Sequence, residues 1–170
     1  MVSSGEDAVT ARGLGAVGQP QPPDVAPETR QDDATILYVP AGGRALRVLV
    51  VDDHRDTADS WSALVQIWGY DARVAYDGAA AFELAAAYQP DVLLVDIAMP
   101  QMNGCQLVRQ LRRQLSLTGK LLVAVTGYAD ETHRLLCAEA GFDLFLVKPV
   151  EPSAMENLLR RHQQQLAGPP

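Results

Sequence analysis

The sequence predicts an α/β domain in which one parallel sheet is covered by helices on both faces. Between residues 46 and 166, short runs of Val and Leu alternate five times with longer segments whose apolar residues recur at helical spacing. Strands that are apolar at every position are typical of parallel sheets, because both of their faces are buried. Five alternating strand and helix segments therefore predict a doubly wound five-stranded sheet.

The expected strands differ in their patterns. The first and third are continuously apolar, as buried strands are, whereas the second alternates between apolar and polar residues and suits an edge position. We place the five strands at residues 47–51, 71–76, 91–96, 121–125 and 143–147.

Capping residues and helix breakers give the expected helix boundaries. Gly69 and Gly141 suit the left-handed conformation that follows a helix, and Pro90 prevents the second helix from continuing. Side chains that accept hydrogen bonds from free N–H groups precede the second, third and fourth helices, and a proline begins the fifth. These residues are Asp77, Asn103, Asp130 and Pro152.

The amino-terminal segment has a different composition. Residues 18–27 are rich in proline, which removes backbone donors and fixes φ, so we expect a disordered or loosely ordered leader over residues 1–45. A short strand at 35–39 is the alternative for one apolar stretch of it. The folded domain is expected at 46–166 and a tail at 167–170.

Composition and charge exclude several classes of protein. The 170 residues carry a net charge of −7, which argues against nucleic acid as the main partner. No apolar run is long enough to cross a bilayer, and the first residues lack the basic and apolar regions of a secretory signal. We therefore expect a cytoplasmic protein with no nucleic-acid partner and no membrane insertion.

Polar residues follow four of the five expected strands. Three carboxylates, one hydroxyl and one ammonium thereby meet at one edge of the sheet, where α/β proteins bind their ligands. These residues are Asp52, Asp53, Asp96, Thr126 and Lys148. Clustered carboxylates repel one another unless a cation is present, and Mg²⁺ prefers oxygen ligands and leaves room for a phosphoryl group.

A carboxylate can itself act as a nucleophile and form an aspartyl phosphate. Phosphoryl transfer requires mainly positioning and neutralisation of charge. Each of these residues alone has an ordinary structural explanation, such as a helix cap or a turn. Their coincidence at the ends of four strands predicts a phosphoryl-transfer site.

The domain resembles the response-regulator receiver of two-component signalling. The matching segments are VLVVDDH, DVLLVDIAMPQMNG, LLVAVTGYAD and GFDLFLVKPV. These motifs look most like those of receivers associated with hybrid histidine kinases. The resemblance covers essentially all of residues 46–166. It implies the flavodoxin-like fold of the chemotaxis response regulator, with strand order 2-1-3-4-5.

The resemblance also implies a phosphorylation and metal site. Asp96 is the expected phosphoryl acceptor. Asp53, Asp96 and the backbone carbonyl of Ala98 are the expected Mg²⁺ ligands, and Asp52 is expected to bind the ion through a water.

The resemblance implies a catalytic role for Lys148 and Thr126, and a switch formed by Thr126 and Phe145. Lys148 is expected to pair with Asp96 and then with the phosphoryl group, and its peptide bond to Pro149 is expected to be cis. Thr126 is expected to move towards the phosphoryl group, while Phe145 changes rotamer behind it.

Two positions are implied to set the lifetime of the phosphorylated state. They are Ala98 and Tyr128, and neither has a carboxylate or amide that could orient water. We therefore expect self-dephosphorylation to be slower than in receivers that have such groups at these positions. Gly127 leaves space beside Thr126, which suits access by a bulky donor.

The three histidines are not expected to do chemistry. His54 adjoins the acidic pair, where it could tune the site or the docking of a donor, but we favour a half-exposed structural residue. His133 and His162 lie in expected helices and are expected to be solvated.

The leading hypothesis is a stand-alone receiver in a phosphorelay. Its expected partners are a histidine kinase or histidine phosphotransfer protein and an unidentified downstream protein target. It is not expected to be an enzyme beyond its own phosphorylation and dephosphorylation. A phosphorylation-independent interaction module is the alternative, although the intact acidic cluster counts against it. A phosphatase would need a general acid and a cap, and a flavin-binding protein would need a phosphate-binding loop after the first strand.

Overall fold

The computed structural model describes residues 44–127 and 130–167. Residues 1–43 lie outside this range, and so do the alternative strand at 35–39, Tyr128 and the end of the tail. No helix in the described ranges combines the length and the apolar character that a membrane span requires.

Five parallel strands form one sheet in the predicted order, β2-β1-β3-β4-β5. Their register brings Val51 beside Val95 and Asp96 beside Val125, so β1, β3 and β4 end at nearly the same level. The strands are β1 (Arg47–Val51), β2 (Asp71–Ala75), β3 (Val92–Asp96), β4 (Leu121–Thr126) and β5 (Leu144–Val147).

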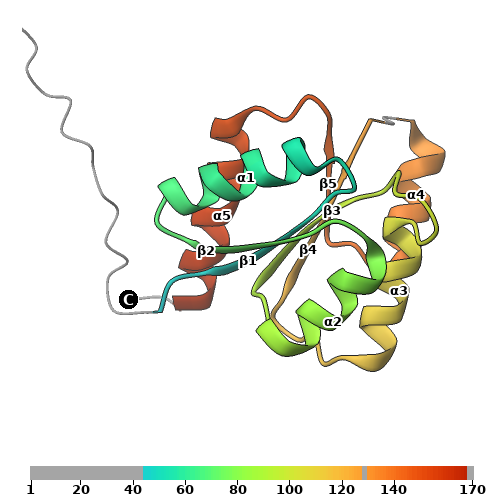
Figure 1. Cartoon of the computed structure of the whole chain (residues 1–170), viewed down its shortest axis with the longest axis horizontal. Helices are drawn as coiled ribbons and strands as arrows, with labels where there is room; N and C mark the ends of the chain where they lie inside the picture. Colours follow the sequence, from blue (N-terminus) through green and yellow to red (C-terminus); the bar gives the residue numbers. More distant parts are fainter. Residues whose placement is uncertain (1–43, 128–129, 168–170) are drawn as a thin grey trace, which may run out of the picture. The chain divides into compact units, whose positions relative to one another are not determined.

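Helices cover both faces of the sheet, as Figure 1 shows: α1 and α5 lie on one face, and α2, α3 and α4 on the other. Alternate side chains of β1 enter different cores, with Val48 and Val50 facing α1 and α5, and Leu49 and Val51 facing the other three helices. The helices are α1 (Arg55–Ile67), α2 (Gly78–Tyr88), α3 (Gly104–Gln114), α4 (Glu131–Ala140) and α5 (Pro152–Ala167).

The expected caps are present. Asp77, Asn103 and Asp130 each accept a hydrogen bond from a backbone N–H in the first turn of the following helix. Asn103 also forms a capping box with Gln106, which fixes the start of α3 close to the end of β3. Gly141 closes α4 with a φ of 102°, in the left-handed region.

The outer edge strand β5 is only partly covered, and Leu144 and Val147 on it are exposed. One expectation requires correction. His162 is not solvated but half-buried on α5, where burial lowers its pKa. Helical periodicity identifies the buried face of α5, but it does not show how far the neighbouring elements cover the His162 side chain.

Candidate functional site

The predicted polar residues meet at the carboxyl edge of the sheet. Asp52 and Asp53 directly follow β1, Asp96 ends β3, Thr126 ends β4 and Lys148 directly follows β5. Because β3 lies between β1 and β4, the three carboxylates and the hydroxyl come from adjacent strands. The strand order therefore assembles the set that the sequence scatters over 97 positions (52 to 148).

Lys148 bridges the carboxylates of two strands. Its Nζ lies 2.9 Å from Oδ2 of Asp52 and 3.3 Å from Oδ1 of Asp96. Its backbone N–H donates to the carbonyl of Thr126 at 2.7 Å, and its peptide bond to Pro149 is cis, as expected. Lys148 thus follows β5, beyond β4 in the sheet, and its ammonium reaches the acidic cluster at the ends of β1 and β3.

Burial and charge perturb these groups in a consistent way. Burial raises the pKa of Asp96 above its usual value, and the attraction of Lys148 only partly opposes this, while the charge of Asp52 adds to it. Burial alone would lower the pKa of Lys148, but its hydrogen bond to Asp52 and the charge of Asp96 raise it. A nearby cation therefore stabilises the charged form of Asp96, and Lys148 stays protonated.

The acidic cluster has the features of a cation site. Asp52, Asp53, His54 and Asp96 each offer one ligand atom, and these atoms lie within 4.8 Å of one another. Oδ1 of Asp53 is buried but accepts no hydrogen bond within the described residues. An unsatisfied buried carboxylate oxygen is costly unless a cation or water binds it. The predominantly carboxylate donor set fits Mg²⁺.

The loop after β3 holds Asp96 closely. The backbone N–H of Ala98 donates to the Asp96 carboxylate, which lowers the pKa of that group and partly offsets burial. Gly104 returns beside the strand, and its N–H donates to the carbonyl of Ile97 at 3.2 Å. A Cβ atom on Gly104 would lie 2.5 Å from the Asp96 carbonyl oxygen, so only glycine fits there. In the sequence Gly104 directly follows the expected helix cap Asn103, but the sequence does not reveal this steric role.

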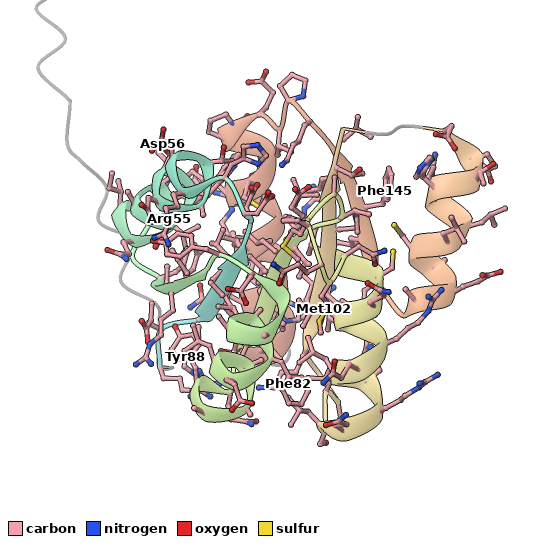
Figure 2. All side chains as sticks on the ribbon, turned by 45° about the vertical axis from the view of Figure 1, so that its right-hand side comes forward. Arg55, Asp56, Phe82, Tyr88, Met102 and Phe145 are labelled. Carbon is pink, nitrogen blue, oxygen red and sulfur yellow. The ribbon has the colours of Figure 1, made fainter. Side chains whose placement is uncertain are left out.

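The remaining expected site residues have different surroundings. Thr126 is buried, with 1% of its surface exposed, whereas Ala98 is exposed on the loop. Phe145 is half-buried and projects from β5 on the side of α4 (Figure 2). Apart from the chain neighbours of Gly127, no atom of the described residues lies within 4 Å of a Cβ built on it, in agreement with open space beside Thr126. Tyr128 lies outside the described residues.

His54 is closer to the site than the sequence indicates. Its Nδ1 lies 3.4 Å from Oδ1 of Asp52 and 3.3 Å from Oδ1 of Asp53. Its position directly after the acidic pair is the only signal in the sequence, and the direction of the ring depends on the turn into α1.

Comparison with known proteins identifies relatives of this chain. The family model for the response regulator receiver domain matches residues 48–160. The response regulator MprA of Mycobacterium ulcerans (strain Agy99) is 36% identical over 119 residues, which are 69% of this chain and 48% of that protein. MprA of Mycobacterium tuberculosis (strain H37Rv) is 35% identical over 119 residues, which are 69% of this chain and 49% of that protein. The chain thus spans about half the length of these curated relatives.

Solved structures agree with this relationship. The chemotaxis protein CheY4 of Vibrio cholerae superposes with a TM-score of 0.66 at 28% identity, covering 69% of this chain and 98% of that one. The N-terminal domain of an uncharacterized protein from Wolinella succinogenes has a TM-score of 0.67 at 25% identity, covering 74% and 100%. The sequence matches, the strand order of the sheet and the acidic site at its carboxyl edge all fit a receiver domain. The chain belongs to the response-regulator receiver family of two-component signalling.

Proposed function

We propose that this receiver takes a phosphoryl group from a phosphohistidine onto Asp96 in a Mg²⁺-dependent reaction. The donor is a histidine kinase or a histidine phosphotransfer protein. The observation that carries the proposal is the buried Asp96 carboxylate, which lies 3.3 Å from the Lys148 ammonium and within the acidic cluster of Asp52 and Asp53.

The chemistry follows from these positions. A carboxylate oxygen of Asp96 attacks phosphorus, a P–O bond forms, and the P–N bond of the donor breaks with its electron pair remaining on the imidazole nitrogen. Lys148 neutralises charge on the transferred group, and the Thr126 hydroxyl donates to a phosphoryl oxygen. Asp53 and Asp96, the backbone carbonyl of Ala98 and, through water, Asp52 would hold Mg²⁺, which neutralises charge on phosphoryl oxygens when bound.

The test is intact-mass spectrometry after incubation with acetyl phosphate and Mg²⁺. We expect one phosphoryl adduct on the unmodified chain and none on Asp96→Asn or in EDTA. Glu83→Gln is the matched control, because it also exchanges a carboxylate for an amide, but at an exposed position on α2. An adduct that persists in Asp96→Asn, or that forms equally well in EDTA, would contradict the proposal.

We further propose that phosphorylation alters a protein-binding surface on α4, β5 and α5. Support comes from four exposed apolar side chains on α4 and β5, which form the kind of surface that partners cover. These are Leu135, Leu136, Leu144 and Val147. Phe145, between β5 and α4, would transmit the change (Figure 2).

Hydrogen exchange with and without a beryllofluoride mimic tests this second step. We expect protection to change in α4 and β5, while α2, on the same face of the sheet, stays constant. Exchange that is identical throughout, with the mimic demonstrably bound, would favour a phosphorylation-independent interaction module instead.

A further inference from the structure

The turn between β1 and α1 leaves the His54 imidazole without a capping role. His54 occupies the N-cap position of α1, but its side chain makes no capping hydrogen bond. Its backbone N–H instead donates to Oδ1 of Asp52 at 2.9 Å, which fixes the backbone against the acidic cluster. Arg55 and Asp56, labelled at the start of α1 in Figure 2, follow directly.

The ring nitrogen lies near two carboxylate oxygens, Oδ1 of Asp52 and Oδ1 of Asp53, of which the second accepts no hydrogen bond within the described residues. Nδ1 of His54 lies 3.3 Å from Oδ1 of Asp53, the buried atom that accepts no hydrogen bond within the described residues. Two donor atoms in neighbouring positions around an octahedral ion with bonds of about 2.1 Å are about 3 Å apart. The observed separation is close to this spacing, so one ion can contact both atoms after a small adjustment.

An imidazole ligand changes which metal ion an otherwise all-oxygen site prefers. Mg²⁺ is a hard cation that gains little from nitrogen, whereas imidazole is a good ligand for divalent first-row transition metals. A site with one imidazole added to its carboxylates therefore discriminates between the two classes of cation more strongly than carboxylates alone.

We propose that His54 is a metal-selectivity residue whose Nδ1 joins Asp53 and Asp96 as a ligand and favours a divalent transition-metal ion over Mg²⁺. This rests on the proposed function, because it assumes that the acidic cluster binds a cation. Most of the His54 side chain, 73%, is exposed, so the ring can turn onto the ion without repacking the core.

The experiment compares Co²⁺ and Mg²⁺ binding to the full chain by calorimetric titration. His54→Ala should weaken Co²⁺ binding by about tenfold or more, the size of effect that ligand-supporting groups have in metal sites. It should change Mg²⁺ binding by much less. His133→Ala is the matched control, because His133 also has a carboxylate partner, Asp130 at 2.6 Å, but on α4. It should leave the ratio of the two affinities unchanged.

A spectroscopic measurement identifies the ligand directly. Pulsed electron paramagnetic resonance of bound Mn²⁺ should show coupling to an imidazole nitrogen, and His54→Ala should abolish this coupling. The exposed position means that the variant should fold normally, which circular dichroism checks.

Different outcomes overturn different proposals. If His54 only forms ion pairs with the carboxylates, its removal leaves the Co²⁺ to Mg²⁺ affinity ratio unchanged and no nitrogen coupling is seen, and the selectivity proposal fails. If the unmodified chain binds neither ion and forms no phosphoryl adduct, the proposed function fails as well.

Discussion

At the scale of single residues, Lys148 balances the acidic cluster. Its ammonium contacts Asp52 and Asp96, so two of the three carboxylates in the cluster share its positive charge. A Mg²⁺ ion and the ammonium therefore repel each other while both are attracted to the same oxygens.

Lys148→Ala should bind Mg²⁺ more tightly, by roughly tenfold, because a nearby positive charge is removed. It should also accumulate less phosphoryl adduct, because charge on the transferred group is no longer neutralised. Calorimetry and intact-mass spectrometry measure the two effects. Weaker Mg²⁺ binding would mean that Lys148 mainly holds the carboxylates in place.

The lifetime of the phosphorylated state is a second residue-scale property. Ala98 is exposed beside Asp96 and has no group that can orient water. Ala98→Asn combined with Tyr128→Glu should accelerate loss of the phosphoryl group, on the order of tenfold, because polar groups then position and activate the attacking water. The decay of the adduct after removal of acetyl phosphate gives the rate. Unchanged decay would show that neither position limits the access of water.

At the scale of elements, the turn from β3 to α3 decides where Asp96 lies. The capping box of Asn103 and Gln106 fixes the first turn of α3, and Gly104 packs against the Asp96 carbonyl. The backbones of β3 and α3 are thus in close contact at Asp96, the proposed phosphoryl acceptor.

Gly104→Ala should destabilise the domain by about 1–3 kcal/mol, as overpacking typically does, because its Cβ would collide with the Asp96 carbonyl oxygen. Mg²⁺ affinity should also fall as Asp96 is displaced. Urea unfolding and Mg²⁺ titration measure these changes. Gly127→Ala is the matched control, because its Cβ meets no atom within 4 Å among the described residues beyond its chain neighbours. Equal losses in both variants would refute the steric explanation.

At the scale of the whole molecule, a second charged cluster stabilises the opposite end of the sheet. Buried Asp91 accepts hydrogen bonds from the Arg44 guanidinium at 2.7 and 2.6 Å and from the Arg47 N–H at 2.9 Å. Lys120 adds a contact at 3.3 Å. Burial alone would raise the pKa of Asp91, but these hydrogen bonds hold it below its usual value.

Asp91→Asn should lower the free energy of unfolding at pH 7 by about 2 kcal/mol, the typical value of hydrogen bonds to a charged group. Because the pKa of Asp91 is lowered by folding, this contribution is complete above the unfolded pKa, near 4, and disappears as the pH falls through the lower folded value. The difference between the two proteins should therefore shrink below about pH 4. Urea unfolding at several pH values tests this, with Glu83→Gln as control. A difference that stays constant down to pH 2 would contradict it.

The sequence by itself determined the five strands, the capping residues Asp77, Asn103 and Asp130, and the set of polar residues at the strand ends. Local rules suffice there, because apolar periodicity and capping act over a few neighbouring residues. The family motifs also implied the strand order and the Lys148–Pro149 cis bond, and the structure agrees with both.

Only the tertiary structure decided the contacts between segments distant in the chain. The Lys148 bridge to Asp52, the burial of His162 and the collision that excludes a side chain at Gly104 each depend on how separate elements pack. His54 is adjacent to Asp53 in sequence, yet the contact of its ring with the unsatisfied oxygen depends on the turn into α1. The sequence identifies the ionisable side chains of the site. The distances between them and their burial govern their electrostatic interactions, and both are set only when the strands pack together.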